Sequence, residues 1–273
     1  MIQTIKKAWG IPELRKKIVF TALILLIFRI GNAIPVPYVD TGLLGTYINQ
    51  LSTTVLSLYN VMSGGAFAQA TIFALGVQPY INSSIIIQLL TIAIPKLEEL
   101  QKDGEDGRKK IQEYTRYTTV GLALIESSAM AIGFGRQGLL IDYNAWNIII
   151  AIVTMTTGSA LLMWIGEQIT EKGVGNGISI VLLINIISRV PDDLVTLYTQ
   201  FMSGKKLAKA GLAGIIILAI LLVVIVFVII LQDGERRIAV QYSKKVQGRK
   251  TYGGQSSHIP LKVNTAGVIP VIF

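Results

Sequence analysis

The sequence of 273 residues contains no cysteine and a single histidine, His258. Without cysteine the chain can form neither a disulfide framework nor a thiolate metal site, and it has no cysteine nucleophile. A lone histidine excludes every site that is built from several imidazoles. These two absences remove large classes of redox and metal-dependent proteins.

Charged residues are also scarce, at 15% of the chain, against roughly 25% in an average globular protein. Hydrophobic residues reach 52%, and the mean hydropathy is +0.58. Such a chain could not cover its own surface with polar groups in water, so an ordinary cytosolic enzyme is excluded. A disordered basic tail is excluded too, because such tails are poor in Ile and Leu. The composition therefore predicts an integral membrane protein.

Six continuous apolar stretches are long enough to cross a bilayer as helices, which takes about 20 residues each. The expected crossings are Ile18–Val36, Gly76–Ile94, Tyr117–Phe134, Trp146–Ile165, Ile178–Leu197 and Leu212–Leu231. Continuous apolar runs of this length predict an all-α, polytopic transmembrane helix bundle.

Basic residues are distributed unequally between the two sides that these crossings define. The amino-terminal segment, the second–third and fourth–fifth connections and the segment after the sixth crossing hold 19 Lys and Arg, whereas the opposite side holds 5 when Arg189 of the fifth crossing is included. Cytoplasmic loops of membrane proteins carry the excess of positive charge. We therefore expect a cytoplasmic amino terminus.

After the sixth crossing, Val263–Phe273 begins another apolar run of eleven residues. Eleven residues cannot span a bilayer. The run is either re-entrant or the start of a further crossing in a longer protein. We favour the second, because the chain stops on Val-Ile-Phe without a polar terminus.

No charged residue occurs from Thr41 to Pro95, a stretch of 55 residues. One crossing uses about 20 of them, and the orientation permits no second one, so roughly Thr41–Leu75 stays on the outer side. The small, apolar run Ala66–Leu75 predicts a short helix, which Gly76 and Pro79 separate from the next crossing. The stretch is therefore either a re-entrant plug in a cavity or one long tilted helix with a Gly-Pro kink.

The cytoplasmic connection Gln232–Lys262 is longer than the topology needs and carries basic and aromatic residues. Val-Gln-Gly at Gly248 predicts the turn of a β-hairpin, with Arg236–Tyr242 as one arm. A basic hairpin suits RNA phosphate or an acidic protein surface, although positive charge in cytoplasmic loops is common without any partner. We favour docking. The basic residues concerned are Arg236, Arg237, Lys244, Lys245, Arg249 and Lys250.

Glu126 lies near the middle of the third crossing, where an ionisable group is by default a functional candidate. We expect it to be protonated or hydrogen-bonded to a neighbouring helix. A secondary transporter with a broken-helix substrate site is the alternative function, because a second crossing interrupted by Gly and Pro would fit one. A membrane enzyme would need a Ser-His or Asp-Asp constellation within the crossings, and the sequence has none.

Several motifs, distributed from the first crossing to the end of the chain, are similar to those of a known protein family. They are Phe28–Gly31 with Ile34–Pro37, Ile72–Gly76, Ser84–Leu90, Met163–Thr170 with Gly175–Ile180, Gln255–Asn264 and Ala266–Pro270. In these motifs the chain resembles the SecY family of protein-conducting channels. The resemblance implies the first inverted-repeat half of the SecY fold, a sixth span and a stub of the seventh.

By this resemblance, residues 1–17 form a cytoplasmic segment, 18–197 the first half-channel, and 198–273 the start of the second half, with the basic loop at 232–262. The implied protein is the central pore subunit of a translocase in the cytoplasmic membrane. It would pass unfolded secretory polypeptides and release membrane segments through a lateral gate between the second–third and seventh–eighth spans.

The resemblance also implies site residues. The plug would be residues 61–75, including Ser63, Gly64, Gly65, Phe67 and Thr71. An apolar pore ring would be formed by Ile81, Ile85, Leu182, Ile186 and Ile272. Family members usually have Ile at the position of Leu182, so the ring stays apolar and its shape differs. Arg237 and Arg249 fall on positions that the family links to the ribosome and the motor.

The implied partners are SecE-type and SecG-type subunits, the SecA motor, the ribosome through its rRNA and proteins, signal peptides and nascent chains, and the lipid bilayer. The energy would come from the motor or the ribosome. We therefore expect no cofactor, no metal ion and no enzymatic activity of the chain itself.

Overall fold

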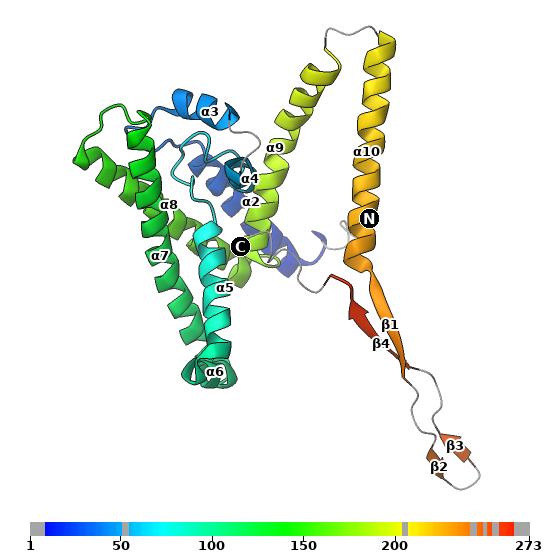
Figure 1. Cartoon of the computed structure of the whole chain (residues 1–273). Coiled ribbons are helices and arrows are strands. Elements are labelled where there is room, and N and C mark those ends of the chain that lie inside the picture. The colour runs from blue at the N-terminus through cyan, green and yellow to red at the C-terminus, as the bar shows by residue number, and fades with distance from the viewer. Residues whose placement is uncertain are drawn as a thin grey trace. The chain divides into compact units, whose positions relative to one another are not determined.

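The computed structural model describes residues 9–50, 55–203, 207–240, 245–247, 250–252 and 257–264. The chain forms two compact units, residues 1–192 and residues 193–273. The described part is mainly helical and has four short strands (Figure 1), so the predicted all-α class is confirmed.

The first unit holds eight helices among its described residues. They are α2 (Pro12–Gly31), α3 (Thr41–Gln50), α4 (Val55–Met62), α5 (Gln78–Ala93), α6 (Pro95–Lys102), α7 (Glu105–Arg136), α8 (Ala145–Lys172) and the greater part of α9 (Gly177–Phe201). α7 and α8 pack against each other, α5 packs against α7, and α2 packs against α8.

Small hydroxyl residues lie where these helices meet. Ser83 of α5 donates a hydrogen bond to the carbonyl oxygen of Thr115 on α7 (2.8 Å), and the hydroxyls of Ser127 on α7 and Thr156 on α8 are 2.8 Å apart. Small and hydroxyl side chains let transmembrane helices approach closely and hydrogen-bond without water. The α5–α7–α8 layer therefore has the type of packing that a lipid environment favours.

Helices occupy all six of the predicted crossings, as α2, α5, α7, α8, α9 and α10 (Leu207–Asp233). By length and composition, α7, α8 and Ala210–Asp233 are each able to cross a membrane. α5 and α6 would make a fourth crossing if taken together, but they bend by 102° at Ile94, because Pro95 disfavours a helical residue before it. The six helices are confirmed, whereas six crossings remain a prediction.

In the uncharged stretch the structure excludes one of the two expectations, and the re-entrant plug stays a prediction. α3 and α4 are too short to span a bilayer, and residues 63–77 form consecutive turns that we call the turn segment. The expected helix at Ala66–Leu75 is wrong, and a single kinked helix is excluded. The backbone at Gly64 and Gly65 is left-handed (φ of 69° and 87°), which ends the helical path directly after α4.

The turn segment belongs to the core of the first unit. Its Phe67 and Leu75 lie in one buried apolar cluster with Leu44 and Met155. Its Phe73 lies in a second cluster, together with Ala66, Phe28, Leu162 and Val181. The segment therefore connects two parts of the core and is not a surface loop.

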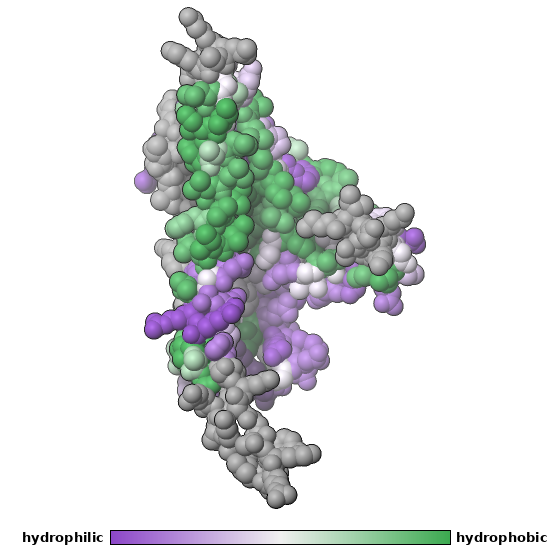
Figure 2. All heavy atoms as spheres, turned by 90° about the vertical axis from the view of Figure 1, so that its right-hand side faces the viewer, coloured by the Kyte–Doolittle hydropathy of each residue, from purple (hydrophilic) through white to green (hydrophobic). Residues whose placement is uncertain are grey.

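The second unit contains the end of α9, helix α10 and two strand pairs. β1 (Glu235–Val240) pairs antiparallel with β4 (Ser257–Lys262), and β2 (Lys245–Gln247) pairs antiparallel with β3 (Lys250–Tyr252). Gln247 is paired with Lys250, so the predicted turn is confirmed, although Gly248 itself lies outside the described residues. The predicted arm Arg236–Tyr242 corresponds to β1 as far as Val240, and β1 pairs with β4 rather than with the strands at this turn. The described side chains of α10 from Leu212 to Leu231 are mostly exposed apolar groups (Figure 2).

Candidate functional site

The turn segment is folded back onto α4 by hydrogen bonds. The hydroxyl of Tyr59 donates to the carbonyl oxygen of Leu75 (2.9 Å), and the backbone N–H of Ala68 donates to Oδ1 of Asn60 (3.0 Å). Burial raises the pKa of the Tyr59 hydroxyl, which keeps it a hydrogen-bond donor. The backbone N–H of Gly65 also donates to the carbonyl oxygen of Asn60 (2.9 Å). α4 and the turn segment thus form one folded piece.

The residues expected in the plug lie inside this piece. Ser63 is buried; its hydroxyl donates to the carbonyl oxygen of Asn60 (3.0 Å) and accepts from the N–H of Phe67 (3.2 Å). The ring of Phe67 packs edge-on against Tyr59, with centroids 5.2 Å apart. Gly65 and Thr71 are buried as well, and Gly64 is half-buried. The structure therefore brings all five residues together in one buried segment.

The carboxyl-terminal half of the turn segment is bound to the chain that follows α2. The N–H of Val36 donates to the carbonyl oxygen of Ala70 (2.7 Å), and the N–H of Ile72 donates to that of Ile34 (3.0 Å). Together these bonds form an antiparallel bridge between Pro35 and Thr71. They explain why no helix forms here, because the backbone groups that a helix would use are paired elsewhere.

Helix α8 touches the turn segment at Gly158. A Cβ at this position would overlap the carbonyl oxygen of Ile72, so glycine allows the two backbones to meet. The neighbouring Phe73 packs on Phe28 of α2, with ring centroids 5.5 Å apart. Residues 70–73 are therefore held from two sides.

The amino-terminal end of the turn segment meets α9. Nδ2 of Asn185 donates to the carbonyl oxygen of Met62 (3.3 Å). A Cβ on Gly64 would lie 2.9 Å from Oδ1 of Asn185, and one on Gly65 would lie 3.3 Å from Nη1 of Arg189. Gly64 is thus required for the close approach of α9, whereas at Gly65 the end of the Arg189 side chain would shift by only a few tenths of an ångström.

A polar hollow of about 410 Å³ borders this contact. Among its lining residues are Arg29 at the end of α2, Gln69 of the turn segment and Arg189 of α9. The sequence analysis did not find this hollow. The charged residues of α2 and α9 were the sequence features that could have indicated it, but whether they lie close together depends on how the helices pack.

The residues expected in the pore ring lie on α5 and α9. Ile81 and Leu182 both pack against the apolar cluster that contains Phe73. Leu182 also borders a very small hollow beside Met62 and Ser63. Ile85 is half-buried and Ile186 is exposed. Ile272 lies outside the described residues, so a closed ring remains a prediction.

The residues expected to dock a partner lie on the strands of the second unit. Arg236 and Arg237 are exposed on β1. Lys245 begins β2 and Lys250 begins β3, and Lys244 and Arg249 lie outside the described residues. The structure thus places four of the six on the hairpin elements.

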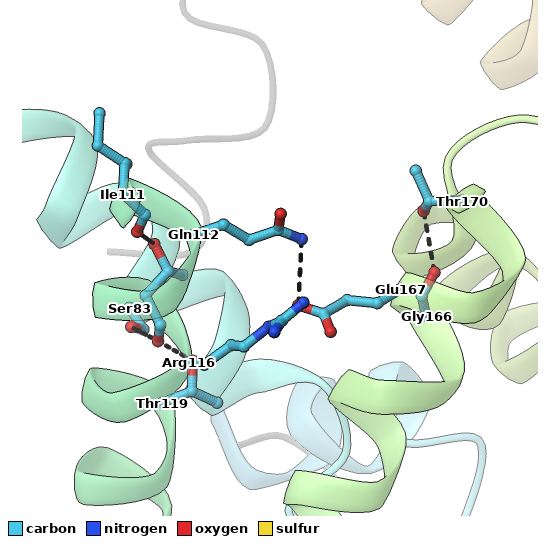
Figure 3. Close-up of polar contacts among 9 residues, drawn as sticks. Ser83, Ile111, Gln112, Arg116, Thr119, Gly166, Glu167 and Thr170 are labelled. Atoms are coloured by element: carbon cyan, nitrogen blue, oxygen red, sulfur yellow. Dashed lines mark hydrogen bonds and ion pairs between the residues drawn. The ribbon is translucent and has the colours of Figure 1, made fainter. Parts of the chain in front are cut away.

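A half-buried ion pair between α7 and α8 was not predicted from the sequence (Figure 3). Nε of Arg116 donates to Oε1 of Glu167 (2.8 Å), and Nε2 of Gln112 donates to the same oxygen (3.3 Å). The side chain of Glu167 is only 7% exposed, whereas that of Arg116 is 41% exposed. The side chain of Glu126, which we expected to be protonated or hydrogen-bonded to a neighbouring helix, lies near that of Asn82 on α5, and its protonation remains a prediction.

Comparison with known proteins decides the family. The model of the SecY family matches residues 71–273. The chain belongs to the SecY family. The protein translocase subunit SecY of Escherichia coli is 44% identical over 269 residues, which are 97% of this chain and 60% of that protein. The chain therefore spans about 60% of the length of this SecY relative.

Solved structures of channels of this type share the fold. One, described as a protein-conducting channel, has a TM-score of 0.56 at 17% identity and aligns with 98% of this chain and 59% of its own. Another is Sec61 in the canine ribosome–channel complex from the endoplasmic reticulum, with a TM-score of 0.50 at 16% identity, covering 92% and 57%. At these identities the likeness shows the SecY fold alone.

Proposed function

We propose that the chain is the amino-terminal part of the pore subunit of a protein-conducting channel. This subunit passes unfolded secretory polypeptides across the cytoplasmic membrane and releases membrane segments sideways. The observation that carries the proposal is the turn segment, a non-helical stretch buried among apolar helices. Non-helical backbone at membrane depth is tolerated where protein encloses it or a water-filled cavity adjoins it, and both conditions suit a removable plug.

The plug and the apolar ring act as two barriers in series. Residues of the turn segment and Leu182 lie around one small hollow. A collar of branched apolar side chains offers ions no hydrogen bonds and tends to lose its water. Such a collar also has no preferred substrate side chain, which suits a channel that passes many different polypeptides. Residues 61–75 are the plug in this proposal.

The hairpin elements of the second unit are the proposed docking surface. Exposed Arg236 and Arg237 on β1 give this surface positive charge, which attracts rRNA phosphate or an acidic motor protein. One solved structure with this fold is a channel in complex with a ribosome. We place this surface and the amino terminus in the cytoplasm, with SecE-type and SecG-type subunits, the SecA motor and nascent chains as further partners.

Proteoliposomes that contain the full-length subunit with its SecE-type and SecG-type partners test the proposal. With motor and ATP, a polypeptide that carries a signal sequence should become protected from external protease, whereas the same polypeptide without its signal should not. Uptake of small solutes without polypeptide transit would instead support the alternative, a secondary transporter, and would contradict the channel.

A further inference from the structure

The two ends of the turn segment are held to the bundle in different ways. At one end, residues 70–72 are bridged to the chain after α2 by two backbone hydrogen bonds and lie against Gly158 of α8. At the other end, the contact with α9 includes one hydrogen bond, from the side chain of Asn185 to the carbonyl oxygen of Met62. The bonds to Tyr59 and Asn60 stay within the folded piece itself, so they do not tie it to the other helices.

The Asn185 side chain fits closely against the plug. It is 1% exposed, and a Cβ on Gly64 would lie only 3.0 Å from its Cα and 3.1 Å from its Cβ. Gly64 has a φ of 69°, which L-residues with side chains rarely adopt. The glycine therefore allows α9 to approach the plug so closely that an asparagine side chain reaches Met62.

The amide of Asn185 is only half satisfied in this arrangement. Nδ2 has its acceptor on Met62, whereas the buried Oδ1 has no hydrogen-bond partner among the residues that the structure describes. An unpaired buried carbonyl oxygen is unfavourable, and this penalty disappears when water reaches it. The hydrogen bond from Nδ2 therefore holds the plug. When this bond breaks, part of the free energy lost is regained because water then hydrates both Nδ2 and Oδ1.

Asn185 shares a face of α9 with the residues proposed for the pore ring. On α9, Asn185 and Ile186 follow Leu182 by three and four residues, and Arg189 follows them by four and three, which places all four along one broad side of the helix. A shift of α9 that moves Leu182 and Ile186 outward therefore also moves Nδ2 of Asn185 away from Met62.

We propose that Asn185 is a positioning residue that latches the Ser63–Gly65 end of the plug to α9. Through this latch, widening of the pore ring and release of the plug become one movement. The proposal rests on the proposed channel function and names the side chain that couples its two barriers.

A buried thiol reports on this latch directly. Ala66 is 1% exposed, so in a cysteine-free version of the full-length protein A66C should react with a water-soluble maleimide only when the plug leaves its seat. Adding Asn185→Ala should raise the labelling rate by roughly 2- to 10-fold, the range expected for one lost hydrogen bond. Ser188→Ala is the matched control, because the Ser188 hydroxyl donates within α9 to the carbonyl oxygen of Asn185 (2.7 Å), and it should leave the rate unchanged.

A second thiol separates latching from general loosening. Ala131 of α7 is fully buried, and labelling of A131C should not change when Asn185→Ala is added. An equal rise at both thiols would overturn the latch, because Asn185 would then support the fold as a whole.

Ion conductance in planar bilayers distinguishes failure of the latch from failure of the function. If deletion of Phe67–Thr71 raises conductance but Asn185→Ala does not change A66C labelling, the latch is wrong and the channel stands. If Asn185→Ala raises the labelling of A66C but not that of A131C, while neither Asn185→Ala nor the deletion of Phe67–Thr71 changes conductance, the latch stands and the proposed channel is wrong.

Discussion

Replacing Gly158 with alanine places a methyl group where α8 meets the carbonyl oxygen of Ile72. Restoring a van der Waals separation requires residue 72 to retreat by more than about 1 Å. This retreat breaks the hydrogen bond from the Ile72 N–H to Ile34, which is 3.0 Å long. Overpacking and the lost hydrogen bond together cost about 2–4 kcal/mol. Since about 1.4 kcal/mol is a factor of ten, the displaced plug should become roughly 30-fold or more populated.

The measurements are maleimide labelling of A66C and ion conductance in planar bilayers, both in the full-length protein. Gly133→Ala on α7 is the matched control, because a Cβ at that position meets nothing within 4 Å, and alanine favours the helix by up to about 1 kcal/mol. Gly158→Ala should raise both signals while Gly133→Ala leaves them unchanged. If the two variants behave alike, the contact between α8 and Ile72 does not hold the plug, and the reasoning is refuted.

Three further predictions concern other parts of the chain. Reversing Arg236 and Arg237 to Glu should weaken ribosome binding, most at low salt where charge is least screened; unchanged binding would leave these exposed charges without a docking role. Ile186→Ser should raise ion conductance, because a hydroxyl lets water bridge the constriction; conductance equal to wild type would remove Ile186 from the ring. Arg116→Ala removes the cation beside the buried Glu167 carboxylate and should lower the free energy of unfolding by about 1.5–3 kcal/mol, the range for a hydrogen bond to a charged group. Adding Glu167→Gln should recover most of that loss, and no recovery would contradict a charge effect.

The helices and the hairpin could be predicted because their signals are local. In an apolar run of about 20 residues, a helix is the structure that pairs every backbone N–H and C=O group within the segment itself. Val-Gln-Gly at Gly248 indicated a turn between two arms, and Gln247 is indeed paired with Lys250. The family motifs then supplied the chain topology that composition alone does not determine.

The turn segment could not be predicted in the same way. Its run of small apolar residues favours a helix, but Ala70 and Ile72 form backbone hydrogen bonds with Val36 and Ile34, far back along the chain. The pair Arg116–Glu167 joins residues 51 positions apart. Such contacts depend on how whole helices pack against one another, and a local sequence pattern does not show which distant residues will meet.

In the channel proposed above, the unequal anchoring of the plug would also determine how it returns after a polypeptide has passed. A pull on the Ser63–Gly65 end breaks the contacts in sequence, starting from Asn185, so no single step has to overcome all of them. If the bridge between Pro35 and Thr71 stays formed, the free part of the plug is a short loop whose closure costs little entropy. The plug then refolds from a fixed starting point and in a fixed register, and the time for which the open pore leaks is limited by local loop closure rather than by a search for the site.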